Sequence, residues 1–309
     1  MNGTRVWNRQ LQVASTVFYK KEKTLALQGM SHWGTAEFFA FIQHKVDICE
    51  GMILKEDSGY LEPAELIELD DLDFDLYCHH LNKKADKVRG AMKMLLDLNY
   101  QWDILKYPGP PQTLCADVSW REDAAFHSYM HVTSQAHRSV DHAYDGEVSW
   151  DLFISSPAEA RTLLSEIMYR FYLILDRHKS LDVKEEMLAL FSEWSETYHF
   201  KNSRKAAELF HSLVYYFGSD LGEREPEHKA FVFDKRESRV CRLVAKIERL
   251  DYVPEILITY GAGHFAALKH GIKATGWKSH GPTTWTSAWT FSPYTTAAML
   301  KALDAVTSV

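Results

Sequence analysis

Residues 25–32 have the sequence Leu25-Ala26-Leu27-Gln28-Gly29-Met30-Ser31-His32, an apolar run that Gly-x-x-His closes. A second such run lies near the other end of the chain, Ile256-Leu257-Ile258-Thr259-Tyr260-Gly261-Ala262-Gly263-His264. Short runs rich in β-favouring residues predict buried strands. We expect the first glycine of each motif to adopt a backbone conformation that a side chain would forbid, which lets the chain leave the sheet there. Ligands bind at the carboxyl edge of open α/β sheets, so the two histidines are expected to converge on one site.

The segments around the first motif predict strands on both sides of it. Residues 13–19 and 24–28 flank a charged turn and are expected to form a hairpin. The next apolar run, residues 46–51, is interpreted as a strand that follows a helix and therefore lies parallel to its neighbour. Glu50 is then expected at the carboxyl end of that strand, beside His32.

Two helices are expected to pack on this sheet. Thr35 is a candidate N-cap for the first helix, whose packing residues would be Phe38, Phe39, Phe41 and Ile42. Residues 235–250 predict the second helix, because apolar side chains form one stripe on it. Arg236 lies one turn before Val240 and so on the buried side, where it needs a carboxylate, a phosphate or a substrate. A structural ion pair is the alternative role for this arginine.

Residues 112–118 predict a short strand that runs into another helix. Ser119 and Glu122 have the spacing of a capping box, which fixes the start of that helix. Asp117 is therefore expected at the end of the strand, in a position like that of Glu50. The alternative is an aspartate that stabilises a turn by accepting hydrogen bonds from nearby backbone amides.

The chain as a whole predicts one α/β domain over residues 1–309. Its centre would be a mixed, largely parallel sheet built from two related halves. A large helical insertion or cap, at approximately residues 56–110 and 157–217, would cover that sheet. The other expected elements are helices at 157–177, 183–194 and 203–217, a short helix ending at Gly271, strands at 273–278 and 284–291, and a closing helix at 294–305.

Composition narrows the classes of protein and of partner. Of 309 residues 46% are hydrophobic, which suffices for a large core, and the net charge of −7 argues against nucleic acid as a partner. The sequence has no signal-type segment and no run of about 18 apolar residues, so no membrane association is expected. The scattered cysteines indicate reduced thiols in a cytoplasmic protein; they are Cys49, Cys78, Cys115 and Cys241. Homo-oligomerisation is left open.

Two further clusters have metal-binding residue types. His127 and His131 lie four residues apart on one helical face, but the glutamate of His-Glu-x-x-His is missing between them. The alternative is a partly exposed helical face. An acidic run is more typical of a solvated surface than of a metal site; it contains Asp70, Asp71, Asp73 and Asp75.

The strand-end residues predict hydrolytic chemistry in two forms. His32, Glu50 and His264 are a credible three-ligand set for a divalent metal with an open position for water. Without a metal, one histidine would act as general base, the glutamate would orient it, and Arg236 would stabilise an oxyanion.

These motifs resemble the TraB/PrgY/GumN and Tiki-like family in their identity and order. The resemblance rests on Gly29-Met-Ser-His32, Asp47-Ile-Cys-Glu50-Gly51, Ala116-Asp117-Val-Ser119, the helix with Arg236, and Tyr260-Gly261-Ala-Gly-His264. It extends from about residue 24 to residue 277, and the wider set includes erythromycin esterases and ChaN-like haem-binding proteins. The chain departs from many relatives in having no arginine soon after Glu50-Gly51.

The resemblance implies an α/β core of two related halves with paired Gly-x-x-His motifs at its site. It implies a metal-dependent peptidase or amidase with manganese or cobalt, acting on a peptide or small molecule. Carried over by position, His32, Glu50 and His264 are the ligands or catalytic set, and Arg236 and Asp117 support them. The alternative function is a binding protein that sequesters a peptide, haem or metal in the same place; the aromatic content of 13% permits haem binding.

Overall fold

A computed structural model of the chain describes residues 3–56, 90, 93–118, 122, 152, 157–177, 189, 202, 204–206 and 234–292. Several predictions therefore lie outside the described residues. They are most of the helical insertion, the closing helix at 294–305, the acidic run from Asp70 to Asp75, and the pair His127 and His131.

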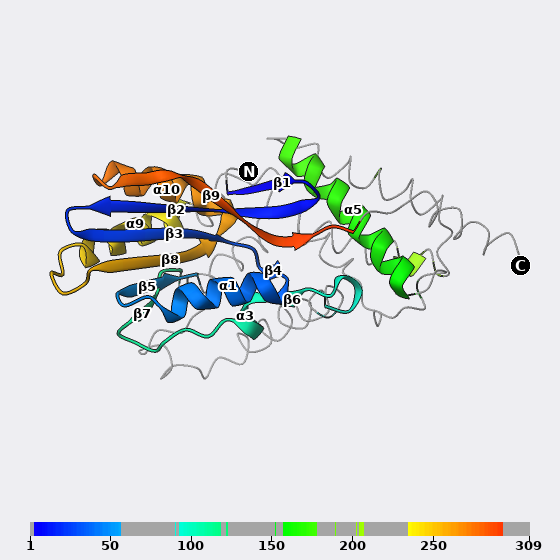
Figure 1. Cartoon of the computed structure of the whole chain (residues 1–309), viewed down its shortest axis with the longest axis horizontal. Coiled ribbons are helices and arrows are strands. Elements are labelled where there is room, and N and C mark those ends of the chain that lie inside the picture. The colour runs from blue at the N-terminus through cyan, green and yellow to red at the C-terminus, as the bar shows by residue number, and fades with distance from the viewer. Residues whose placement is uncertain are drawn as a thin grey trace, which may run out of the picture.

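The described residues build a seven-stranded mixed sheet (Figure 1). Its strand order is β1-β2-β3-β8-β5-β7, and β9 pairs with β2. The centre, β3, β8, β5 and β7, is parallel, whereas β1, β2 and β9 run antiparallel to their neighbours. The predicted α/β class with a mixed sheet is thus confirmed. The bounds are β1 Thr4–Trp7, β2 Gln10–Lys20, β3 Lys23–Met30, β5 Met52–Lys55, β7 Thr113–Cys115, β8 Glu255–Gly261 and β9 Lys278–Thr290.

The predicted hairpin is confirmed, and the strands predicted at 46–51 and 273–278 are wrong. β2 and β3 pair antiparallel through a tight turn between Lys20 and Lys23. Residues 46–51 are not a strand, because the helix before them continues through Asp47 and β5 begins only at Met52. The strand expected at 273–278 is instead the end of the helix α10 (Phe265–Ala274) and a turn, whereas the strand expected at 284–291 is confirmed as part of β9, which begins earlier, at Lys278.

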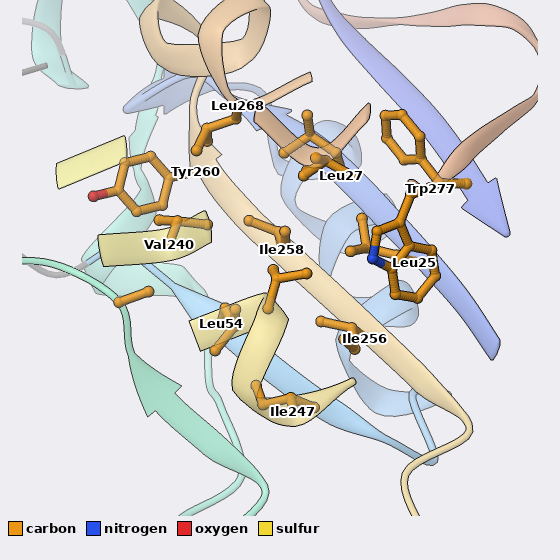
Figure 2. Packing of buried hydrophobic residues seen from close by; sticks show 14 of the residues in the cluster. Leu25, Leu27, Leu54, Val240, Ile247, Ile256, Ile258, Tyr260, Leu268 and Trp277 are labelled. Carbon is orange, nitrogen blue, oxygen red and sulfur yellow. The ribbon is translucent and has the colours of Figure 1, made fainter. Parts of the chain in front are cut away.

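Helices cover both faces of the sheet (Figure 1). On one face lies α1 (Ala36–Asp47), where Thr35 caps the helix as expected by accepting a hydrogen bond from the Phe38 amide. Its buried side chains pack against the sheet, but Phe41 is exposed, contrary to the prediction. The other face is covered by α9 (Arg236–Ile247) and α10 (Phe265–Ala274), which pack on the strands through an apolar cluster (Figure 2).

Smaller elements complete the described part. The helix α5 (Pro157–Arg177) has the predicted bounds, and Glu166 on it forms an ion pair with Arg9. The short strands β4 (Trp33–Gly34) and β6 (Asn99–Tyr100) pair antiparallel, and α3 (Gln101–Ile104) follows directly.

No helix within these described ranges combines the length and the apolar character needed to span a membrane.

Candidate functional site

The four parallel strands end at one edge of the sheet, which we call the carboxyl edge. Met30 at the end of β3 pairs with Gly261 at the end of β8, so both Gly-x-x-His motifs leave the sheet from neighbouring strands at this edge. That part of the convergence prediction is confirmed. The polar side chains that follow the strand ends are His32 after β3, Glu56 after β5, Asp117 after β7 and His264 after β8.

The prediction for Glu50 is wrong. This residue precedes β5 and is exposed, and the adjacent Gly51 lies against the backbone of Glu255, the first residue of β8. At about 3.3 Å per residue, β8 separates the two edges by roughly 20 Å. Metal–ligand bonds are about 2 Å long, so Glu50 and His264 cannot bind the same ion.

Arg236 is held between two carboxylates at the carboxyl edge. Its Nε and Nη2 donate to the two oxygens of Asp117 at 2.6 and 2.5 Å, and Nη2 also donates to Oε1 of Glu56 at 2.6 Å. The side chains of Arg236, Glu56 and Asp117 are 11%, 6% and 0% exposed. The expectation that this arginine faces inward toward a carboxylate is therefore confirmed. We call these three residues the carboxylate–arginine cluster.

The charges of this cluster do not cancel. Two carboxylates face one guanidinium, which leaves a formal charge of −1 in a buried place. Burial disfavours the charge on Arg236, but the adjacent carboxylates outweigh it and raise the pKa of the guanidinium. Backbone amides supply further donors, from Gly261 to Glu56 at 2.5 Å and from Val118 to Asp117 at 2.7 Å.

The glycines that begin the two motifs provide room rather than unusual backbone angles. Neither Gly29 nor Gly261 has a positive φ, so our conformational interpretation of them is wrong. A Cβ at Gly261 would lie 2.9 Å from Oε2 of Glu56, and one at Gly29 would lie 2.9 Å from the carbonyl oxygen of Ala14. The missing side chain at Gly261 lets the carboxylate approach its amide.

His264 is buried and paired with a carboxylate from α9. Its Nδ1 lies 3.1 Å from Oε1 of Glu237, and its ring meets the Tyr260 ring edge-on at 5.1 Å. The guanidinium of Arg236 lies over the same Tyr260 ring at 5.6 Å. Burial raises the pKa of Tyr260, and the carboxylates of the cluster add to this effect against the opposing guanidinium. The phenol therefore stays protonated, and its hydroxyl points away from the apolar side chains (Figure 2).

His32 lies in different surroundings at the same edge. Its ring stacks on Trp102 with centroids 5.0 Å apart, and its backbone carbonyl accepts a hydrogen bond from the backbone N–H of Gln101. Nδ1 of His32 is buried and has no hydrogen-bond partner in the described part of the chain. The structure thus brings both histidines to one edge. His32 contacts residues of α3, whereas His264 contacts a residue of α9.

Sequence reasoning missed two carboxylates of this site. Glu56 follows the apolar run Met52-Ile53-Leu54 and would have been found if the strand had been placed four residues later. Glu237 is adjacent to Arg236 on the helix that was predicted, but no pattern in the sequence marks it as a partner of His264.

The described residues do not provide the metal-ligand set that the family resemblance implies. Glu50 is at the opposite edge, Glu56 and Asp117 are bound by Arg236, and Glu237 is bound by Nδ1 of His264. Among residues with described positions, no group of three His, Cys, Asp or Glu side chains is arranged to hold a metal ion.

Comparisons of the chain with family models, with curated proteins and with solved structures gave no match.

Proposed function

We propose that this chain is a hydrolase of the peptidase or amidase type, with His264 as general base and Glu237 as the residue that orients it. The observation that carries the proposal is the buried Nδ1–Oε1 contact of 3.1 Å between them at the carboxyl edge of a parallel sheet. A base held by a second group in this way is the arrangement used to activate water or a nucleophile.

The proposal assigns the proton of the neutral His264 ring to Nδ1. An ionised carboxylate only accepts hydrogen bonds, so in the proposed resting state a neutral imidazole carries its proton on Nδ1 and Nε2 is the basic nitrogen. In the proposed reaction a water proton moves to Nε2 while the water oxygen bonds to the substrate carbonyl carbon. The imidazolium then returns its proton to the leaving amine or alcohol as the C–N or C–O bond breaks. The Arg236 guanidinium and the Tyr260 hydroxyl, which is buried without a partner in the described residues, are the donors for the developing oxyanion.

The resemblance to the TraB/PrgY/GumN and Tiki-like family supports a hydrolase, and also proposes a divalent metal such as manganese or cobalt. A metal-dependent mechanism for this hydrolase would need a carboxylate ligand other than Glu50. In such an enzyme the ion would lower the pKa of a bound water. The two versions make different predictions for chelators, and the same assay therefore tests both.

The experiment measures cleavage of a peptide library by the purified chain. His264→Ala should lower kcat/KM by about 100-fold or more, and Glu237→Gln by about 10-fold, because the base is lost or misoriented. His270→Ala is the matched control, since this histidine is exposed on α10 and should leave turnover unchanged.

Equal turnover by His264→Ala and the unaltered chain would contradict the proposal. Loss of turnover in EDTA, with recovery on adding manganese or cobalt, would establish the metal version. Saturable peptide binding with no cleavage in the unaltered chain would instead establish the sequestering function.

We also propose a cytoplasmic location. The supporting observation is that Cys49, Cys115 and Cys241 are free thiols, as expected in a reducing compartment. Fractionation of cells that express the chain tests this location directly.

A further inference from the structure

Unpartnered buried polar atoms gather near His32. The described part of the chain has eight buried side-chain nitrogen or oxygen atoms without a hydrogen-bond partner. Three of them, His32 Nδ1, Trp33 Nε1 and Gln101 Oε1, lie on two segments joined by the β4–β6 pairing and by the hydrogen bond from the backbone N–H of Gln101 to the His32 carbonyl. Folded proteins satisfy about 90% or more of such groups, so this concentration needs a cause.

Gln101 is the most informative member of this group. The residue is almost fully buried, with an exposure of 6%, yet the side-chain oxygen Oε1 has no hydrogen-bond partner within the described residues. A buried polar group left without a partner costs about 1–3 kcal/mol. An apolar side chain of the same size would fill the same space without the free-energy cost of an unpartnered polar atom, so space filling alone does not explain a glutamine at this position.

The aromatic residues beside Gln101 provide a surface open to solvent. Trp102 stacks on His32 on one side and contacts Tyr100 at 5.0 Å, which holds the indole in place. Trp102 as a whole residue is nevertheless 37% exposed, whereas Tyr100 is buried. The unpartnered polar atoms thus lie next to an accessible, rigid ring.

We propose that His32, Gln101 and Trp102 form a binding subsite for an amide group of the substrate. A glutamine amide both donates and accepts, so it can pair with the N–H and the C=O of a peptide group. Trp102 packs against the side chain next to that group, and Nδ1 of His32 takes part in a further hydrogen bond. The inference rests on the proposed hydrolase function, to which it adds the recognition of amides over esters.

The position of the subsite fits this role. It follows β3, while His264 follows β8, and these strands end side by side at the carboxyl edge. A peptide held at His32 therefore continues along the edge toward the proposed base. A site built to hydrogen-bond an N–H discriminates against an analogue that lacks it, because its own acceptor is then left unpaired.

The test uses two matched sets of compounds with the same cleavable bond. One set consists of N-acetyl amino acid p-nitroanilides, and the other replaces the acetamido N–H by an ester oxygen. KM is measured for each pair. The dissociation constant is measured for the same pairs with the His264→Ala chain, in which slow turnover leaves time for binding to equilibrate. The unaltered chain should prefer the amide by about 10-fold, and Gln101→Met should abolish the preference.

A stability measurement separates recognition from a structural role. Because Oε1 of Gln101 is buried without a hydrogen-bond partner in the described part of the chain, Gln101→Met should leave the urea midpoint unchanged or shift it upward. A structural glutamine would lower the midpoint on substitution. Trp102→Phe should keep most of the affinity, whereas Trp102→Ala should weaken binding of both sets equally.

The outcomes distinguish the two proposals. A preference for the amide in the binding measurement, with no turnover of any compound, would support the subsite and contradict the hydrolase function. Turnover without amide preference in the unaltered chain, or a preference retained by Gln101→Met, would overturn the subsite alone. The absence of binding by every compound would also overturn the subsite.

Discussion

At the scale of single residues, the environment of Arg236 was largely predictable but its full set of partners was not. The apolar stripe of its helix placed the guanidinium on the buried side, where physical chemistry demands an anion. Asp117 was available as a strand-end carboxylate. Glu56 was missed because residues 46–51 suit either a helix or a strand, and burial of Val46 against Ile53 and Leu257 keeps the helix intact past the predicted boundary.

The carboxylate–arginine cluster gives a residue-scale prediction. Arg236→Met should lower the free energy of unfolding by about 3–5 kcal/mol, because it leaves two buried carboxylates without their cation. Urea denaturation followed by circular dichroism measures the change. Arg242→Met on the same helix is the control; this exposed arginine should contribute within about 0.5 kcal/mol.

The same cluster predicts a rescue. Adding Glu56→Gln and Asp117→Asn to Arg236→Met removes the uncompensated charges, so the triple variant should be more stable than Arg236→Met alone. A triple variant less stable than Arg236→Met would show that the arginine does not act through these two partners.

At the scale of elements, helix starts were predicted better than helix ends. Thr35 is a local feature, since a cap needs only its own side chain and an amide three residues on. The end of α1 instead depends on contacts with β5 and β8, which are far apart in sequence. The same limit explains β9, whose single long strand is set by pairing along nearly all of β2.

The cap of α1 gives an element-scale prediction. Thr35→Ala should lower the free energy of unfolding by about 1 kcal/mol, because the Phe38 amide loses its acceptor. Thr35→Ser retains the hydroxyl and should stay close to the unaltered chain in the same thermal or urea unfolding measurement. Equal losses in the two variants would assign the effect to the threonine methyl group rather than to the cap.

At the scale of the whole molecule, parallel strand topology explains why distant motifs meet. The rule that parallel strands end at one edge was sufficient to bring His32 and His264 to that edge. The Glu237–His264 pair was not predictable, because it depends on how α9 lies across the sheet. Packing of α9 through Val240, Val244 and Ile247 decides that placement.

The buried thiol of Cys49 makes the stability of the whole native state depend on pH. Burial raises the pKa of its thiol from 9.0 to about 11, and the nearby Glu255 adds to this shift. As the pH rises, the Cys49 thiol loses its proton in the unfolded chain before it does so in the native chain. The contribution of this thiol to the free energy of unfolding is therefore complete below about pH 9 and is lost as the pH rises through about 11.

Two measurements check this expectation for Cys49. Iodoacetamide at pH 8.5 should label it far more slowly in the native chain than in urea, as read by mass spectrometry of its peptide. Between pH 8.5 and 10.5, the urea midpoint of the unaltered chain should fall more than that of Cys49→Val. Parallel falls in the two chains would contradict the assignment.

The partners of Arg236 also bear on folding kinetics. Asp117 and Glu56 are 119 and 180 residues away in sequence, so each contact closes a very long loop. Such contacts are expected to form after the folding transition state, because the entropy of loop closure must first be offset by other interactions. The cluster would then retard unfolding rather than accelerate folding, and so lengthen the lifetime of the native state.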